Sequence, residues 1–161
     1  GPYPLGYHGL GELFVLIFFG FVSVGGTVFV NLSRLTPAAW GMSLPLGLLI
    51  VGILVVNNYR DIDADRLAGK NTLVVRFGEH FARREYLFCM GVSFAVMPLY
   101  CALGWVPWWA MLTWLALPLA ARNVRRMFTQ KGRPLNAVLA GTGQLALAFG
   151  LLFLAGSFIA G

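Results

Sequence analysis

The sequence predicts an all-α fold, a polytopic transmembrane bundle with five spans. Of the 161 residues, 58% are hydrophobic and only 11% are charged, whereas soluble domains carry about 25% charged residues. The mean hydropathy is +0.75. Because lipid offers no partners for free backbone groups, apolar runs of about 20 residues cross a bilayer as helices. These figures exclude a soluble globule, a disordered chain, a coiled coil and a small disulfide scaffold.

Five apolar runs mark the expected spans, which together form a single transmembrane domain over residues 1–161. In order, they cover about 13–32, 40–56, 86–103, 105–121 and 135–159. Lipid bilayer is therefore the expected surrounding of most of the chain.

Glycine and proline residues inside these runs predict where helices touch and bend. The glycines at five positions are expected to mark close helix contacts: Gly20, Gly25, Gly26, Gly47 and Gly52. Pro45, Pro98 and Pro118 also lie inside runs. There a neighbouring helix can satisfy the carbonyl that a proline leaves without a donor.

The basic residues predict the orientation in the membrane. If the spans alternate, the connections 57–85 and 122–134 share one side, which then holds eleven of the twelve Lys and Arg residues. The positive-inside rule places that side, with the Asp-rich loop 57–85, in the cytoplasm. Four tryptophans lie at the opposite ends of their spans, as an aromatic belt requires: Trp40, Trp105, Trp108 and Trp109. The net charge of +6 thus reflects membrane topology, and no nucleic-acid partner is expected.

The segment between the second and third spans carries the chemistry. Three of the six acidic residues fall within five positions there. On a helix continuing from the second span, Asn57, Asp61 and Asp65 share one face, where like charges repel and favour a bound cation. Mg²⁺ takes one or two carboxylates and completes its shell with water and phosphate oxygens. Arg60 and Lys70 flank the carboxylates and suit a diphosphate.

Simpler roles for the acidic residues stay open at this point. The aspartates can form a solvated loop in which one of them caps the next helix. Glu12, at the start of the first span, either stabilises the positive end of its helix or contacts a substrate.

Several motifs resemble those of UbiA-superfamily prenyltransferases. The second aspartate-rich motif of that family resembles residues 57–65 (NNYRDIDAD), 69–73 (GKNTL) and 76–78 (RFG). The segments before the family's fifth and last helices resemble residues 1–7 (GPYPLGY), 9–14 (GLGELF) and 132–136 (GRPLN). Within the superfamily, the whole chain most closely resembles the 1,4-dihydroxy-2-naphthoate polyprenyltransferases of menaquinone biosynthesis.

This resemblance implies a nine-helix enzyme of the bacterial inner membrane, with the five spans as its fifth to ninth helices. It implies Mg²⁺-dependent transfer of a polyprenyl group from polyprenyl diphosphate to 1,4-dihydroxy-2-naphthoate, with decarboxylation to demethylmenaquinone. By resemblance, Asp61 and Asp65 are metal ligands and catalytic residues. Arg60 is both catalytic and diphosphate-binding, and Asn57 and Lys70 also bind the diphosphate.

The family also carries an earlier N-x-x-x-D-x-x-x-D motif, whereas this chain has a single stretch with that spacing. By resemblance, the chain is expected to be a carboxy-terminal portion that is inactive without its amino-terminal half or a partner chain.

Other functions stay open. A related enzyme would use another aromatic acceptor, such as 4-hydroxybenzoate. CDP-alcohol phosphotransferases also hold metal on intramembrane aspartates, but their D-G-x-x-A-R motif is absent from the sequence. The chain can instead be half of a membrane transporter or a scaffold, for which charged residues at mid-depth are expected.

Overall fold

The structure, a computed structural model, describes the chain from residue 5 to residue 161. Residues 1–4, which open the motif predicted at 1–7, lie outside the described residues. Within the described part, all regular secondary structure is helical and no strand occurs. Four helices are long and apolar enough to cross a membrane by length and composition. The predicted all-α polytopic membrane bundle is therefore confirmed.

The elements follow one another with short connections. In chain order they are η1 (Leu5–His8), α1 (Gly11–Val15), η2 (Leu16–Val22), α2 (Ser23–Leu32), α3 (Pro37–Arg60), α4 (Ile62–Leu67), α5 (Leu73–Phe77), α6 (Glu79–Ala102), η3 (Trp108–Ala116), α7 (Leu117–Thr129) and α8 (Leu135–Ile159). The π-helical η2 joins α1 to α2 without a break, so Gly11–Leu32 forms one span.

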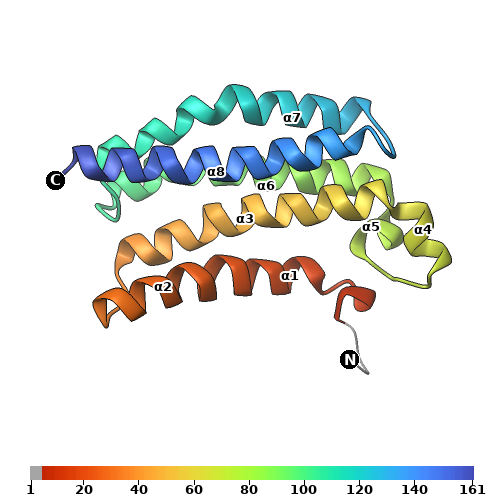
Figure 1. Cartoon of the computed structure of the whole chain (residues 1–161), viewed down its shortest axis with the longest axis horizontal. Helices are drawn as coiled ribbons and strands as arrows, with labels where there is room; N and C mark the ends of the chain where they lie inside the picture. Colours follow the sequence, from red (N-terminus) through yellow and green to blue (C-terminus); the bar gives the residue numbers. More distant parts are fainter. Residues whose placement is uncertain (1–4) are drawn as a thin grey trace.

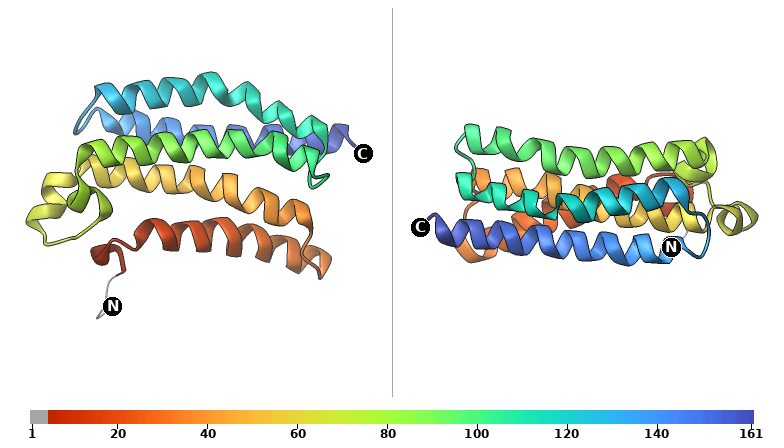
Figure 2. Two further views of the ribbon diagram at one scale, coloured as in Figure 1. Left: turned by 180° about the vertical axis from the view of Figure 1, so that it is seen from behind. Right: turned by 90° about the horizontal axis from the view of Figure 1, so that it is seen from above.

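The long helices lie side by side and alternate in direction (Figure 1). The α3–α6 connection, which contains α4 and α5, lies at the same end as the α7–α8 turn. The α2–α3 turn, the α6–η3 turn and the carboxy terminus lie at the other end (Figure 2). Most of the basic residues therefore gather at one end of the bundle, as the alternation of spans predicts.

Two predicted boundaries differ from the structure. The segment predicted at 105–121 is the 3₁₀ helix η3 followed by the start of α7, so it is not one regular α-helix. The predicted loop 57–85 is mostly helical, because α3 continues to Arg60 and α6 begins at Glu79. Helices can continue beyond the apolar run because their backbone hydrogen bonds do not depend on lipid.

Helix α3 lies at the centre of the bundle. It packs against α6 and α8 on one side and against the first span on the other. Of the residues in its most apolar stretch, 67% are buried. On the adjacent α6, Pro98 leaves the Phe94 carbonyl without its usual donor. The indole Nε1 of Trp114 donates to that oxygen at 3.2 Å. A neighbouring helix thus repairs the break at this proline, as expected.

The first span packs on α3 through a pair of glycines. A Cβ atom on Gly20 would lie 2.7 Å from the Ser43 carbonyl oxygen, and one on Gly47 would lie 2.9 Å from the Gly20 Cα. Gly52 similarly faces Met90. The prediction is wrong for Gly26, whose added Cβ would meet nothing within 4 Å. Sequence position alone does not tell which side of a helix faces its neighbour.

The glycine pair yields a prediction for bundle stability. Alanine at Gly20 or Gly47 is expected to lower the free energy of unfolding by about 1–3 kcal/mol, because the two backbones must separate to admit a methyl group. Alanine at Gly26 is the matched control and is expected to leave stability unchanged or raise it by up to about 1 kcal/mol. Denaturant unfolding in detergent micelles, followed by circular dichroism, measures both. Equal destabilisation by all three variants would contradict this packing.

Candidate functional site

The ion pairs of the described residues gather at the end of the bundle that carries α4 and α5. All five involve residues between Arg60 and Lys131, at the end of α3, in α4, at the start of α6 or in the two nearby connections. Lipid does not solvate charge, so charged side chains collect where a membrane helix leaves the hydrocarbon. A site for an anionic group is therefore expected at this end.

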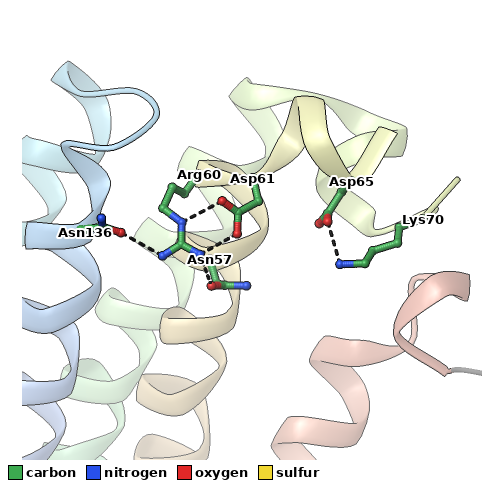
Figure 3. Close-up of polar contacts among 6 residues, drawn as sticks. All are labelled: Asn57, Arg60, Asp61, Asp65, Lys70 and Asn136. Atoms are coloured by element: carbon green, nitrogen blue, oxygen red, sulfur yellow. Dashed lines mark hydrogen bonds and ion pairs between the residues drawn. The ribbon is translucent and has the colours of Figure 1, made fainter. Parts of the chain in front are cut away.

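The guanidinium of Arg60 is the best-connected cation there. Its Nε and Nη2 donate to the two carboxylate oxygens of Asp61 at 2.8 and 2.5 Å. Its Nη2 also donates to Asn57 Oδ1 at 2.8 Å, and its Nη1 donates to Asn136 Oδ1 at 2.9 Å. Figure 3 shows these groups converging between α3 and the first turn of α8. The bidentate geometry fixes the plane of the guanidinium.

Asp65 forms a second, separate pair with Lys70. The Lys70 Nζ donates to Asp65 Oδ1 at 2.7 Å, and the Asp65 side chain is only 8% exposed. The ammonium also lies 5.7 Å from the centroid of the Tyr7 ring. The structure thus joins the predicted residues as two groups, one around Arg60 and one around Lys70.

The expectation that Asn57, Asp61 and Asp65 share the face of one continuous helix is wrong. Helix α3 ends at Arg60, and Asp61 has φ −102° and ψ 13°, outside the helical region, before α4 begins. The bidentate contact with Arg60 turns Asp61 toward α8, while Asp65 points to Lys70 (Figure 3). Repulsion between the two carboxylates is relieved by one cation on each.

Backbone contacts hold the segment that carries Lys70. Gly69 adopts a left-handed conformation (φ 70°) that ends the α4 turn, as glycine readily does. Thr72 caps α5 by accepting from the Val75 amide at 3.2 Å. The Asn71 amide donates to the Tyr7 carbonyl at 3.0 Å. These bonds fix η1 against the α4–α5 connection.

The hydrogen bonds and charges at the site shift the pKa values of Asp61 and Lys70 in opposite directions. The hydrogen bond from Arg60 holds the pKa of Asp61 below its ordinary value; the charges of Arg60 and Lys70 act in the same direction, and burial opposes them. The hydrogen bond to Asp65 raises the pKa of Lys70. Asp61 is therefore ionised and Lys70 protonated at neutral pH.

The structure reveals a third polar group that the sequence reasoning missed. Arg83 Nη2 donates to the Tyr59 hydroxyl at 2.7 Å, and that hydroxyl donates to Glu79 Oε2 at 3.4 Å. Lys131 from the α7–α8 turn binds the same Glu79 oxygen at 2.5 Å. The only available signal was their position at the predicted cytoplasmic ends of spans. Pairing between distant helices is not visible in one sequence.

Glu12 has a partner inside the bundle. It is 7% exposed, and its Oε1 accepts from Asn58 Nδ2 at 2.9 Å. The Oε2 atom of Glu85 is also buried and has no hydrogen-bond partner among the described residues. Glu12 lies in the first turn of α1, where a carboxylate stabilises the positive end of the helix. The contact with Asn58 adds a role that the sequence did not suggest, because it joins α1 to α3.

The donor set suits a hard divalent cation in part. Carboxylate and amide oxygens are the ligands that Mg²⁺ prefers, and it needs few protein carboxylates when phosphate oxygens complete its shell. Among the described residues, however, no group of three or more acidic, His or Cys side chains is placed to hold a metal. Asp61 and Asp65 therefore offer part of a metal site, and each is now paired with a cation.

The chain is similar to proteins of a known family. Residues 2–137 match the UbiA prenyltransferase family. The chain is 38% identical to a 1,4-dihydroxy-2-naphthoate octaprenyltransferase of Escherichia coli, over 99% of this chain and 52% of that protein. It is 33% identical to the protein of the same name in Haemophilus influenzae, with the same coverage of 99% and 52%.

A human relative, UbiA prenyltransferase domain-containing protein 1, is 29% identical over 96% of this chain and 44% of its own length. The chain thus spans about half the length of the curated relatives it matches. No solved structure shows a significant match. The family match covers most of the chain, including the whole segment that carries Asp61 and Asp65. The chain belongs to the UbiA prenyltransferase family.

Proposed function

We propose that this chain forms part of a prenyltransferase that moves a polyprenyl group from a polyprenyl diphosphate to 1,4-dihydroxy-2-naphthoate. The observation that carries the proposal is the end-to-end similarity to 1,4-dihydroxy-2-naphthoate octaprenyltransferases, together with two aspartates and two cations at one end of the bundle. This end would face the cytoplasm of a bacterial inner membrane, because most of the basic residues lie there.

The proposed diphosphate site uses the cations that now neutralise the aspartates. Arg60 presents its guanidinium from a fixed position, because Asn57 and Asn136 hold it in addition to Asp61. Lys70 lies on a connection fixed by its own hydrogen bonds and is 36% exposed. Both cations can exchange a carboxylate partner for diphosphate oxygens. Such charge-assisted hydrogen bonds stabilise a leaving diphosphate.

Exchange of those partners would free Asp61 and Asp65 as metal ligands. Mg²⁺ bound to them and to the diphosphate would supply charge that stabilises the departing group. The two carboxylates alone fill only part of a coordination shell. We therefore propose that further aspartates, from another segment or a partner chain, complete the site.

The proposed reaction breaks the allylic carbon–oxygen bond, and the electron pair leaves with the diphosphate. The electron-rich naphthoate ring then bonds to the prenyl carbon, and the acceptor carboxylate departs as carbon dioxide, which gives demethylmenaquinol, the hydroquinone form of demethylmenaquinone. The bundle contributes by excluding water from the cationic prenyl carbon.

The alternative reading as half of a transporter receives less support. A transport path calls for charged residues at mid-depth, whereas the ion pairs of the described residues lie at one end. An assay that offers either acceptor distinguishes 1,4-dihydroxy-2-naphthoate from the alternative acceptor, 4-hydroxybenzoate.

A chimera tests the proposed activity. The chain replaces the matching half of the Escherichia coli relative, and membranes with the chimera receive octaprenyl diphosphate, Mg²⁺ and either acceptor. We expect prenylation of 1,4-dihydroxy-2-naphthoate and not of 4-hydroxybenzoate. Asp61→Asn or Asp65→Asn is expected to lower the rate at least about a hundredfold, because loss of a metal ligand removes several kcal/mol of transition-state stabilisation.

Asp63→Asn is the matched control, because Asp63 is 89% exposed and pairs only with the exposed Arg66. Its rate should stay within about twofold of the unmodified chimera. The unmodified Escherichia coli protein, expressed and assayed in the same way, is the control for assembly in the membrane. If that protein is active and the chimera is inactive, or if all three aspartate variants behave alike, the proposal fails.

The ionisation state that the proposal requires can be measured directly. Asp61, Asp63 and Asp65 are the only aspartates in the chain, so ¹³C-aspartate labelling yields three carboxyl signals by NMR. We expect Asp61 to titrate below the ordinary Asp value of about 3.9. Arg60→Gln is expected to move its titration to higher pH, whereas Arg66→Gln, which loses only the exposed contact with Asp63, should not.

The lowered pKa of Asp61 also predicts how the stability of the fold depends on pH. Because the pKa of Asp61 is lowered in the folded state, the contact with Arg60 stabilises the fold above the ordinary Asp pKa. That contribution is lost as the pH falls through the lowered value. An Asp61 signal that titrates at or above the ordinary value in the unmodified chain would contradict the pairing.

A further inference from the structure

A groove runs along the outside of the bundle between α6 and the η3–α7 segment. Its volume is about 720 Å³, and small side chains on both walls hollow it: Gly91 and Ala95 on α6, and Ala120 and Ala121 on α7. A Cβ atom on Gly91 would meet nothing within 4 Å. The groove is therefore open space that no side chain of the described residues fills.

The groove is apolar except at one end. The Trp114 indole lies at the end nearest η3, and its N–H is already satisfied by the Phe94 carbonyl. Arg125 is the only charged residue among those that line the groove. Arg125 lies near the carboxy-terminal end of α7, and that end of the helix leads into the α7–α8 turn (Figure 1).

No acidic partner of Arg125 is found among the described residues. None of the ion pairs of the described residues includes Arg125 or its neighbours Arg122 and Arg126 on α7. One cation, Arg125, thus lines an otherwise apolar groove, and Arg122 and Arg126 lie within three positions of it on the same helix. A ligand that matches both features carries a negative charge at one end and a hydrocarbon chain behind it.

The length of the groove fits one leaflet of a bilayer. Between Leu117 and Phe128, both of which line it, α7 rises about 16 Å at 1.5 Å per residue. Half of a hydrocarbon core of about 30 Å is about 15 Å. From Arg125 to Leu117, α7 rises about 12 Å at 1.5 Å per residue, so a chain with its charged group at Arg125 would extend most of the way to the bilayer midplane.

We propose that this groove binds an anionic phospholipid, with one acyl chain between α6 and α7 and the phosphate at Arg125. This site is distinct from the proposed substrate site, which lies between α3, α8 and the α4–α5 connection, and it does not depend on the proposed function. A polyprenyl diphosphate fits the groove less well, because no carboxylate lines it to hold a metal beside a diphosphate.

Native mass spectrometry of the detergent-solubilised chain tests the proposal. Phosphatidylglycerol and phosphatidylcholine with identical acyl chains are titrated separately, and the bound fraction is counted. We expect tighter binding of phosphatidylglycerol. Arg125→Gln is expected to weaken it about fivefold, since one cation near an anionic lipid surface contributes about that factor. Gly91→Leu extends a side chain into the groove from a position where a Cβ atom meets nothing within 4 Å, and it is expected to weaken phosphatidylglycerol binding at least as much.

Two variants serve as matched controls. Arg34→Gln removes one charge at the opposite end of the bundle, and Gly150→Leu adds the same side chain to an open position on α8. Neither should change phosphatidylglycerol binding by more than about twofold. The proposal is overturned if both lipids bind equally, if Arg34→Gln acts like Arg125→Gln, or if farnesyl diphosphate displaces the lipid. A dimer that Gly91→Leu abolishes would assign the groove to a second copy and would overturn it too.

Discussion

The geometry of the site depends on one guanidinium, that of Arg60. It lies at the end of the central helix α3 and binds Asp61 with two hydrogen bonds, while Asn57 and Asn136 accept two more. Because Asn136 belongs to the first turn of α8, this single group joins two helices that are far apart in sequence. Asp61 binds this guanidinium, whereas Asp65 binds Lys70. A membrane protein places such a cluster at the hydrocarbon boundary, where charge can be both solvated and held by helix ends.

Much of the fold could be predicted from the sequence because lipid restricts the possible structures. Apolar runs indicated the spans, and the basic residues indicated that two connections share one end. The boundaries were less predictable, since α3 continues through polar residues to Arg60 and the segment before α7 is a 3₁₀ helix. Gly26 shows the same limit on a smaller scale. Glycine is the residue type expected at a close helix contact, yet a Cβ atom at this position would meet nothing within 4 Å.

The residues of the candidate site could be predicted from the sequence, but the contacts between their side chains could not. The spacing of Asn57, Asp61 and Asp65 suggested one shared face, but α3 ends at Arg60 and the carboxylates of Asp61 and Asp65 bind different cations. Asn136, Tyr59 and Glu79 were missed as contributors because each acts through a partner on another helix. The structure shows that Asp61 and Asp65 each bind a cation of their own. The charges of these two pairs therefore balance until an anion replaces the carboxylates as the partner of Arg60 and Lys70.

The most direct test of this reading is a structure with Mn²⁺, in place of Mg²⁺, and a prenyl thiodiphosphate that reacts slowly. Anomalous scattering would locate the metal independently of the surrounding density. The account predicts a metal bound to Asp61 or Asp65 or to both, with Arg60 and Lys70 moved from those carboxylates to the diphosphate. A metal elsewhere, or a bound diphosphate with both ion pairs intact, would contradict it.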